Sequence, residues 1–460
     1  MQQIDTYYFL GIGGIGMSAL ARYFVAKGNR VLGYDRTSSP LTQTLEAEGI
    51  EVQYDDSLEK VKELDKAKTV VVRTPAVPED MAVYVYLREQ GFRILKRAEV
   101  LGIVTRSERA LCVAGTHGKT TTSTMLAHIL HQSHVGANAF LGGIANNYGT
   151  NLLLDDSTNV VVEADEFDRS FHHLTPYISV ITSMDPDHLD IYGTEDAYRK
   201  SFEKYAGLVE KALVVKATLS PCMIKVASPQ CKVYSYGVED KAADFYAENV
   251  RIDNGEIWFD FHTPEHVIKD VQLGVPVWVN IENGVAAMAV AWLMGATDAE
   301  LKAGMSNFSG VYRRFNIHVN TTKVAYVDDY AHHPMELKAC IESVRRLYPE
   351  RYVIGVFQPH LFSRTKDFVD GFATVLSGLD EVALLPIYPA REKPIEGVSS
   401  EWLLEKIQAK RALVLPNILS KYLRERVKSC LAQNKDCVVI TMGAGDIDRQ
   451  VKEITKALQI

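Results

Sequence analysis

Residues 110–132, ALCVAGTHGKTTTSTMLAHILHQ, place a short apolar run, a glycine-containing loop and a helical pattern in direct succession. In such a strand–loop–helix unit the loop N–H groups wrap phosphates, a lysine reaches the β and γ oxygens, and a threonine hydroxyl binds Mg²⁺. The usual pattern has a glycine where this chain has Val113, so the loop is a shortened form, G-T-x-G-K-T. The stretch predicts ATP or GTP binding by Gly115, Thr116, His117, Gly118, Lys119, Thr120 and Thr121.

Two later apolar runs end in side chains that bind metals. Glu163 closes the strand-like run in VVVEADEFD, and His188 lies in MDPDHLD, after the run YISVIT. Parallel strands bring their carboxyl ends to one edge of a sheet, which is also the edge of the phosphate loop. A strand-end carboxylate is often merely solvated, and a lone histidine is often a loop or core residue. Because a nucleotide triphosphate needs a divalent cation, we interpret Thr120, Glu163 and His188 as metal ligands.

A second glycine loop lies near the N-terminus. Residues 11–16, GIGGIG, follow an apolar run and open a helical pattern, and Asp35 ends the next apolar run. Glycines in this context let the backbone approach a diphosphate at a helix N-terminus. The motif alone fits a nicotinamide or flavin dinucleotide, a nucleotide-sugar, or a tight turn without a ligand, and it does not decide among them.

Strand and helix patterns alternate in three blocks of the chain, which predicts an α/β fold built on parallel sheets. A Rossmann-like domain is expected over 1–105, a central ATP-binding domain with a mostly parallel sheet over 106–315, and a C-terminal Rossmann-like α/β domain over 316–460. The second boundary is placed at NFSGVYRRFNIH, where a helix gives way to a loop with paired arginines.

Composition excludes several classes of protein. The formal net charge of −8 argues against a protein that coats nucleic acid or binds membranes through a basic patch. The first residues lack the basic segment and long apolar stretch of a signal peptide, so none is expected. No uncharged apolar run reaches the ~20 residues of a membrane span. We therefore expect a cytoplasmic protein with no nucleic-acid partner and no membrane insertion. The six cysteines have no metal-ligand spacing and are expected to be reduced thiols.

An ordered set of motifs resembles the Mur ligase family over nearly the whole chain. In order, the motifs are GIGGIGMSALA, AGTHGKTTT, EADEFDRSFHHL, MDPDHLD, YRRFN, DDYAHHPMEL, FQPHLFSRT and GAGD. FHHL and MDPDHLD look like the alanine-adding branch of the family. The resemblance implies that ATP and Mg²⁺ serve to join L-alanine to the lactyl carboxylate of UDP-N-acetylmuramate, through an acyl phosphate, in peptidoglycan synthesis. It leaves a weak homodimer open.

The resemblance also implies roles for individual residues. The N-terminal loop would bind the UDP-sugar through Gly11, Gly13, Gly14, Ile15, Gly16 and Asp35, with Thr74, Pro75 and Ala76 in the same pocket. The nucleotide would be contacted by Asn280, Asn283, Arg314 and Asp329. The amino-acid side would hold Tyr330, His332 and Arg364, where His332 or His333 would orient the amine or take its proton, or be structural. The residues expected to act in catalysis are Lys119, Glu163, His188 and His332.

Three positions depart from the family pattern. The usual P-G-x-H-N becomes Pro276–Asn280, which weakens the expected contacts to adenine. Leu361 stands where some relatives have a second arginine on the acceptor side. Phe202 stands where sister ligases carry a carbamylated lysine, with Lys200 and Lys204 beside it, and the alanine-adding branch generally lacks that lysine.

Alternative functions remain open from the sequence. A recycling ligase that joins a preformed tripeptide to UDP-N-acetylmuramate shares GTHGKTTT and EADE. A dinucleotide-dependent oxidoreductase is supported by GIGGIG and Asp35 alone. A nucleotide-switched binding protein would release phosphate without regard to sugar or amino acid.

Overall fold

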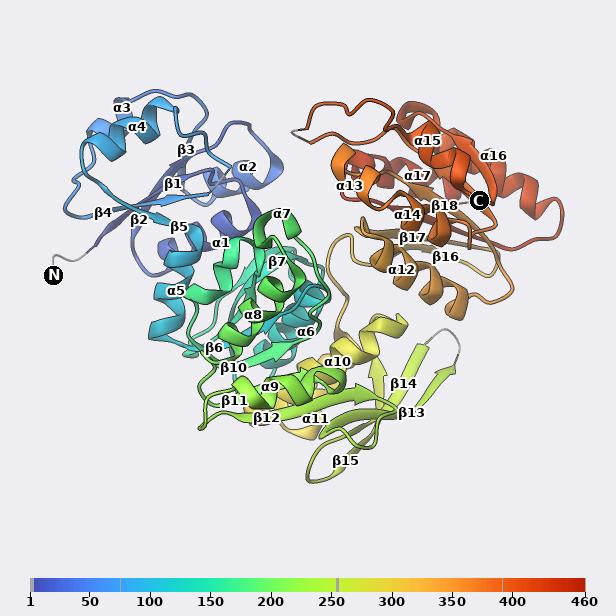
Figure 1. The fold of residues 1–460 in the computed structure, drawn as a ribbon, viewed down its shortest axis with the longest axis horizontal. Coiled ribbons are helices and arrows are strands. Elements are labelled where there is room, and N and C mark those ends of the chain that lie inside the picture. The colour runs from blue at the N-terminus through green and yellow to red at the C-terminus, as the bar shows by residue number, and fades with distance from the viewer. Residues whose placement is uncertain (1–3, 75, 254–255, 391, 460) are drawn as a thin grey trace. The chain divides into compact units, whose positions relative to one another are not determined.

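The computed structural model describes residues 4–74, 76–253, 256–390 and 392–459. Within these ranges the chain forms three sheets flanked by helices (Figure 1). The three-domain α/β architecture expected from the alternating patterns is confirmed. Each of the apolar runs quoted above forms a strand, because stretches such as 160–162 are fully buried and side chains on both faces pack under helices.

The first sheet is parallel throughout, in the order β3-β2-β1-β4-β5. Its strands are β1 (Thr6–Leu10), β2 (Arg30–Tyr34), β3 (Glu51–Gln53), β4 (Thr69–Arg73) and β5 (Arg93–Lys96). Its helices are α1 (Ile15–Ala26), α2 (Pro40–Ala47), α3 (Glu59–Lys62), α4 (Ala82–Glu89) and α5 (Arg97–Ser107). The order places the β1–α1 glycine loop at the middle of the sheet, at the carboxyl edge where α/β folds bind ligands.

The second sheet has the order β15-β14-β13-β12-β11-β10-β6-β9-β7-β8. Its first strands are β6 (Arg109–Ala114), β7 (Asn138–Ala145), β8 (Thr150–Leu153), β9 (Asn159–Ala164), β10 (Pro176–Ile181) and β11 (Ala212–Lys216). It continues through β12 (Lys232–Val238), β13 (Phe245–Asp253), β14 (Glu256–His262) and β15 (Val267–Leu273). The helices of this part are α6 (Lys119–His131), α7 (Leu189–Tyr192), α8 (Glu195–Ala206), α9 (Ser220–Val226), α10 (Trp278–Leu293) and α11 (Asp298–Asn307).

The third sheet has the order β16-β17-β21-β18-β19-β20, and its first strand is antiparallel to the second. The strands are β16 (Asn316–Asn320), β17 (Val324–Asp329), β18 (Tyr352–Phe357), β19 (Glu381–Leu384), β20 (Lys410–Leu413) and β21 (Cys437–Met442). The helices are α12 (Pro334–Leu347), α13 (Phe362–Asp367), α14 (Val369–Leu376), α15 (Ser400–Lys406), α16 (Leu419–Leu431) and α17 (Val451–Leu458).

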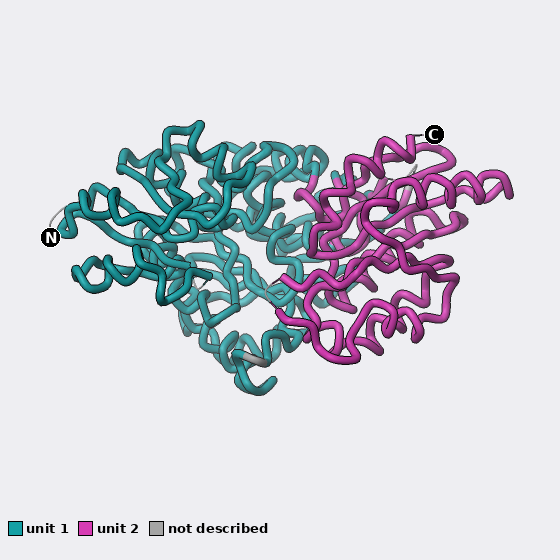
Figure 2. Tube along the Cα trace, turned by 90° about the horizontal axis from the view of Figure 1, so that it is seen from above, with its two compact units in different colours: residues 1–251, 258–274, 282–309 teal, residues 252–257, 275–281, 310–460 magenta. Residues whose placement is uncertain are grey.

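The chain divides into two compact units (Figure 2). The first comprises Met1–Arg251, Trp258–Gly274 and Glu282–Ser309, and the second comprises Ile252–Ile257, Val275–Ile281 and Gly310–Ile460. Among the described residues, no helix combines the length and the apolar character that a membrane crossing requires.

One apolar core joins the first two sheets inside the first unit. It runs from Phe9 and Tyr23 to Phe140 and Val162. The rings of Tyr23, on α1, and Phe140, on β7, lie 5.1 Å apart, and Asn151 of β8 donates to the carbonyl oxygen of Ile15 over 2.5 Å. The helix that carries the N-terminal glycine loop is therefore fixed against the second sheet as well as against its own.

Candidate active site

The phosphate loop lies between β6 and α6, at the carboxyl edge of the second sheet. Gly115 has φ +137° and Gly118 has φ +82°, so both adopt backbone conformations that side chains disfavour. A Cβ on Gly115 would lie 2.0 Å from the hydroxyl oxygen of Thr182, which follows β10. The loop thus needs glycine at these positions both for its turns and for its close approach to the neighbouring strand.

Lys119 is the first residue of α6 and folds back over the loop. Its Nζ donates to the carbonyl oxygens of Gly115 at 2.7 Å and Thr116 at 3.3 Å. It also lies 2.9 Å and 2.7 Å from the two carboxylate oxygens of Glu166, which is 2% exposed. Burial opposes the lysine's charge, but the nearby carboxylates of Glu166 and Glu163 outweigh it and raise the pKa of Lys119. Burial raises the pKa of Glu166 to about 7.

Polar side chains hold the rest of the loop. The Thr116 hydroxyl bonds to the carbonyl oxygen of Asp185 at 2.7 Å and to the hydroxyl of Tyr198 at 2.8 Å. The backbone N–H of His117 donates to the Ser183 hydroxyl at 2.9 Å. Thr120 is buried in the first turn of α6, and Thr121, next to it, is partly exposed. The predicted loop residues therefore form one continuous structure.

Two of the three predicted metal ligands lie on or after the strands on either side of the phosphate loop. β6 lies between β9 and β10, and Val113 is in register with Glu163. His188, beyond β10, has φ +53° and caps α7, with its ring 5.1 Å from that of Phe167. Its Nε2 lies 3.7 Å from an Asp187 carboxylate oxygen. The described residues contain no ready-made group of three or more His, Cys, Asp or Glu side chains placed to hold a metal.

A glycine on the adjacent strand leaves room for the Glu163 carboxylate. A Cβ on Gly142 of β7 would lie 2.0 Å from one carboxylate oxygen of Glu163 and 2.8 Å from the other. The carboxylate therefore fills the space that a side chain at 142 would take. Because magnesium prefers oxygen donors, the Thr120 hydroxyl and the Glu163 carboxylate fit this ion. His188 offers a nitrogen at the next strand end.

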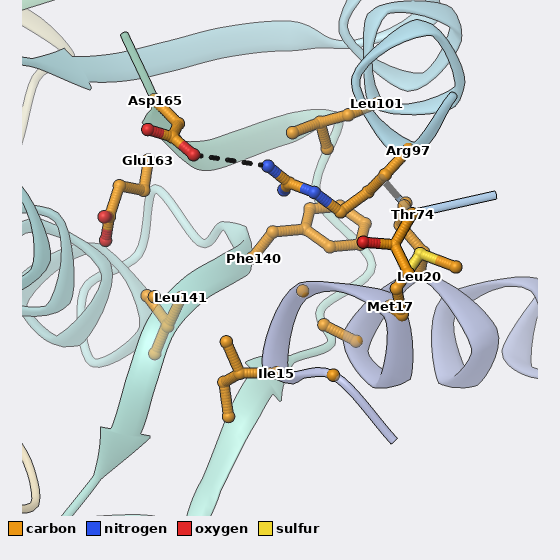
Figure 3. Close-up of a pocket in the computed structure, with 14 residues that line it drawn as sticks. Ile15, Met17, Leu20, Thr74, Arg97, Leu101, Phe140, Leu141, Glu163 and Asp165 are labelled. Atoms are coloured by element: carbon orange, nitrogen blue, oxygen red, sulfur yellow. Dashed lines mark ion pairs between the residues drawn. The ribbon is translucent and has the colours of Figure 1, made fainter. Parts of the chain in front are cut away.

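A cavity of about 280 Å³ in the first unit connects the N-terminal glycine loop to Glu163 (Figure 3). Gly14, Ile15 and Gly16 line one part of it, at the start of α1. Arg97 and Asp165 form an ion pair of 3.5 Å across another part. The remaining lining is largely apolar and comprises Met17, Ala19, Leu20, Thr74, Leu101, Phe140, Leu141 and Gly142. The start of α1 suits an anionic group of a ligand, whereas the Glu163 carboxylate would repel such a group unless a cation lay between them.

The other residues predicted for this pocket are placed as follows. The N–H of Gly13 donates to the carboxylate of the half-buried Asp35 at 2.8 Å, so Asp35 stabilises the loop. Gly11 has φ +85°, and a Cβ there would lie 2.5 Å from the methyl group of Thr74. Ala76 is exposed, and Pro75 lies outside the described residues.

Of the two predicted asparagines, Asn283 lies over the phosphate loop. Its Oδ1 accepts from the Thr122 hydroxyl at 3.2 Å and would lie 2.8 Å from a Cβ on Gly118. Asn280 lies earlier on α10, in the segment assigned to the second unit, and its amide donates to the carbonyl oxygen of Val275 at 3.4 Å. Both asparagines are buried.

In the second unit, Asp329 ends β17 and holds the paired-arginine loop. Its carboxylate accepts from the backbone N–H groups of Phe315 at 2.8 Å and Ala331 at 2.7 Å. Burial raises the pKa of Asp329 to about 7, although Arg314 opposes this. The guanidinium of Arg314 lies 5.0 Å from the centre of the Tyr330 ring. Arg313, by contrast, is buried and donates to the carbonyl oxygens of Gly443 and Gly445, so Arg314 is the more accessible of the pair.

The predicted acceptor-side residues gather at the same edge of the third sheet. His332 contacts the carbonyl oxygen of Tyr330 through Nδ1 at 3.0 Å and lies 3.2 Å from Glu336. Burial lowers the pKa of His332, the Glu336 carboxylate opposes this, and the charge of Arg364 lowers the pKa further. His333 instead caps α12, with its ring 4.7 Å from that of Phe368.

His360 joins this group and was not assigned a role from the sequence. Its ring lies 6.1 Å from that of His332 and stacks on Tyr388 at 5.6 Å. Burial, with His332 and Arg364, lowers the pKa of His360 to about 4, so the ring is neutral at neutral pH. Leu361 has φ +69° and its N–H donates to the carbonyl oxygen of Tyr388, which sets the start of the helix that carries Arg364.

Comparison with known proteins bears on the whole chain. Three family models match: "Mur ligase family, catalytic domain" over residues 6–109, "Mur ligase middle domain" over 113–291, and "Mur ligase, glutamate ligase domain" over 313–445. A UDP-N-acetylmuramate–L-alanine ligase of Phocaeicola vulgatus is 53% identical, with 98% of this chain and 97% of the relative covered. The ligase of the same name from Flavobacterium johnsoniae is 46% identical, covering 100% and 99%.

Solved structures share the fold. The crystal structure of a UDP-N-acetylmuramate–alanine ligase from Thermotoga maritima superposes with a TM-score of 0.79 at 25% identity and covers 99% of each chain. A murein peptide ligase from Psychrobacter arcticus gives a TM-score of 0.69 at 21% identity, again over 99% of each chain.

Proposed function

The chain belongs to the Mur ligase family, and on that premise we propose that it joins L-alanine to the lactyl carboxylate of UDP-N-acetylmuramate, converting ATP to ADP and phosphate. The observation that carries this proposal is that one cavity is lined both by the N-terminal glycine loop and by Glu163, a strand neighbour of the phosphate loop. A nucleotide-sugar bound by its diphosphate at the start of α1 would direct its far end toward the phosphate-transfer site. We place the reaction in the cytoplasm.

The chemistry needs activation of a carboxylate. In the first step the carboxylate oxygen bonds to the γ-phosphorus of ATP as the bond to the β-phosphate oxygen breaks, which gives an acyl phosphate and ADP. Lys119 would neutralise charge that spreads over the transferring phosphoryl oxygens. Thr120, Glu163 and His188 are the residues that would hold Mg²⁺, which supplies further positive charge at these oxygens.

The second step forms the amide. The neutral amine of L-alanine bonds to the acyl carbon, phosphate leaves, and the nitrogen loses one proton. Arg364 would bind the carboxylate of alanine, since a planar guanidinium offers two charge-assisted hydrogen bonds. His332, whose lowered pKa keeps it neutral, would orient the amine or accept its proton. Asn280, Asn283, Arg314 and Asp329 would contact the nucleotide, and Tyr330 the acceptor side.

The alternative functions receive less support. The full-length relatives at 53% and 46% identity are alanine ligases, whereas the murein peptide ligase from Psychrobacter arcticus shares only the fold at 21% identity. An oxidoreductase would leave the phosphate loop and the ion-paired Lys119 without a role.

The test measures phosphate release from Mg-ATP with UDP-N-acetylmuramate and L-alanine omitted singly and together. We expect turnover only with both substrates present, and none when L-Ala-γ-D-Glu-diaminopimelate replaces alanine. Equal ADP production without the sugar nucleotide would refute the proposal. Turnover with UDP-N-acetylmuramate and the tripeptide, but not with UDP-N-acetylmuramate and alanine, would identify the recycling ligase.

A further inference from the structure

The ammonium of Lys119 is already engaged on all sides by groups of this chain. Two backbone carbonyl oxygens and the Glu166 carboxylate lie within 3.3 Å of Nζ. A lysine in a phosphate loop acts by pointing at the β and γ oxygens of the nucleotide. These contacts therefore compete with the function of the lysine, and the charged one is the strongest competitor.

The backbone of Glu166 is itself held in the turn that follows β9. The carbonyl oxygen of Glu166 accepts from the Tyr192 hydroxyl at 2.5 Å and from the N–H of Arg169 at 2.9 Å. The turn continues through Asp168 and Arg169, at φ +51° and +56°. The backbone of Glu166 is thus fixed in this turn, so its carboxylate can follow the ammonium only by rotation of its own side chain.

We propose that Glu166 is a positioning residue for Lys119: it holds the ammonium against the loop and competes for it with the phosphates of the nucleotide. This inference rests on the proposed ATP site. Glu166 then sets the affinity for nucleotide, because each binding event exchanges a buried carboxylate–ammonium contact for a phosphate–ammonium contact.

The exchange of partners also makes the affinity for nucleotide depend on pH. The charged and titratable groups that act on Glu166 are Lys119, the carboxyl of Asp165 and the phenols of Tyr192 and Tyr198, and the Glu163 carboxylate also acts on the charge of the lysine. When Lys119 turns to the phosphates, a 2% exposed carboxylate is left beside new negative charge, and its pKa rises above the value of about 7 that it has without nucleotide. The complex then keeps a proton that the free protein has lost, so affinity falls as pH rises through 7, by at most about tenfold per pH unit.

The experiment measures the Kd of Mg-ADP by calorimetry from pH 6 to 9, without sugar nucleotide or amino acid. Glu166→Gln keeps the shape and removes the charge, and we expect it to bind Mg-ADP about tenfold more tightly at pH 8, since a hydrogen bond to a charged group is lost from the competing state. The affinity of the wild-type protein should fall more steeply with rising pH than that of Glu166→Gln, because only the wild type has the titrating carboxylate. The titration of the phosphate itself is common to both proteins and cancels.

Two variants serve as controls. Glu166→Asp retains a carboxylate and should retain the pH dependence. Asp168→Asn, in the same turn, removes an exposed carboxylate that pairs with Lys96 and should leave the Kd unchanged. Unaltered melting temperatures would establish that all variants are folded.

The outcomes separate this inference from the proposed function. Weaker binding by Glu166→Gln, or the same Kd and pH profile as wild type, would overturn the role of Glu166 and leave the ATP site in place. If Lys119→Ala also left the Kd unchanged, the phosphate loop itself would not be the nucleotide site.

Discussion

Substitution of Gly142 by alanine should impair turnover without destabilising the fold. The new Cβ would lie 2.0 Å from one oxygen of Glu163, whereas ordinary contact begins at 3.4 Å, so the carboxylate must retreat by more than about 1 Å. Gly142 is exposed, its φ lies outside the left-handed region, and the atoms it meets are the far end of a flexible side chain. The backbone can therefore stay where it is.

The expected size follows from that displacement. A misplacement of about 1 Å at a reacting centre lowers the rate by roughly 100-fold. The cost in stability should remain below ~1 kcal/mol, because a side chain moves and no buried backbone is displaced. The assay is steady-state phosphate release with Mg-ATP, UDP-N-acetylmuramate and L-alanine, alongside thermal unfolding. Gly207→Ala, where an added Cβ meets nothing closer than 3.4 Å, is the matched control and should keep its rate.

A double-mutant cycle tests whether the effect acts through Glu163. In a Glu163→Ala background, where no carboxylate remains to be displaced, Gly142→Ala should have little further effect on the rate. Two results would refute the reasoning: a near-normal rate for Gly142→Ala, or an equal loss in both backgrounds. The second result would mean that alanine at 142 obstructs the cavity itself.

Three further predictions concern other parts of the chain. Arg364→Lys should raise the KM for L-alanine about tenfold through loss of the paired hydrogen bonds and leave the KM for ATP unchanged, and an unaltered alanine KM would move carboxylate binding elsewhere. Phe202 is fully buried against Phe171, so no carbamylated lysine occupies that position and bicarbonate-free buffer should not change the rate; recovery of lost activity on adding bicarbonate would contradict this. His128 is buried and burial lowers its pKa to about 4. Between pH 6.5 and 4 this histidine is therefore protonated in the unfolded chain and neutral in the folded protein. The free energy of unfolding should therefore decrease as the pH is lowered from 6.5 to 4, by up to ~1.4 kcal/mol per pH unit. Urea unfolding at pH 4.5, 5.5 and 6.5 should show a weaker pH dependence of this free energy in His128→Gln.

Local patterns predict much of the fold and the centre of the site. The phosphate loop is a continuous strand–loop–helix stretch, so its chemistry can be read from adjacent residues. Glu163 and His188 were predicted to lie at one sheet edge because parallel strands end together, and β9 and β10 do flank β6. Strands β12 to β15 lie in a stretch for which no element was predicted, since no motif marks it.

Contacts that depend on where loops turn were not predicted. Glu166 lies 47 residues from Lys119, and their pairing depends on the path of the chain after β9, which no periodicity encodes. The motif EADE nevertheless contains Glu166, and this second glutamate could have suggested a buried carboxylate partner for Lys119. Gly142 offered one signal, because a glycine within a strand often marks a close approach by another group.

The apolar core shared by the first two sheets limits how the chain can be cut or recombined. A fragment ending near residue 105 would turn the Tyr23 face of α1 to water, and a fragment beginning there would expose Phe140 in the same way. Neither piece would be self-sufficient. A chimaera that takes its amino-terminal sheet from one relative and its central sheet from another should therefore inherit both sides of this contact from the same parent.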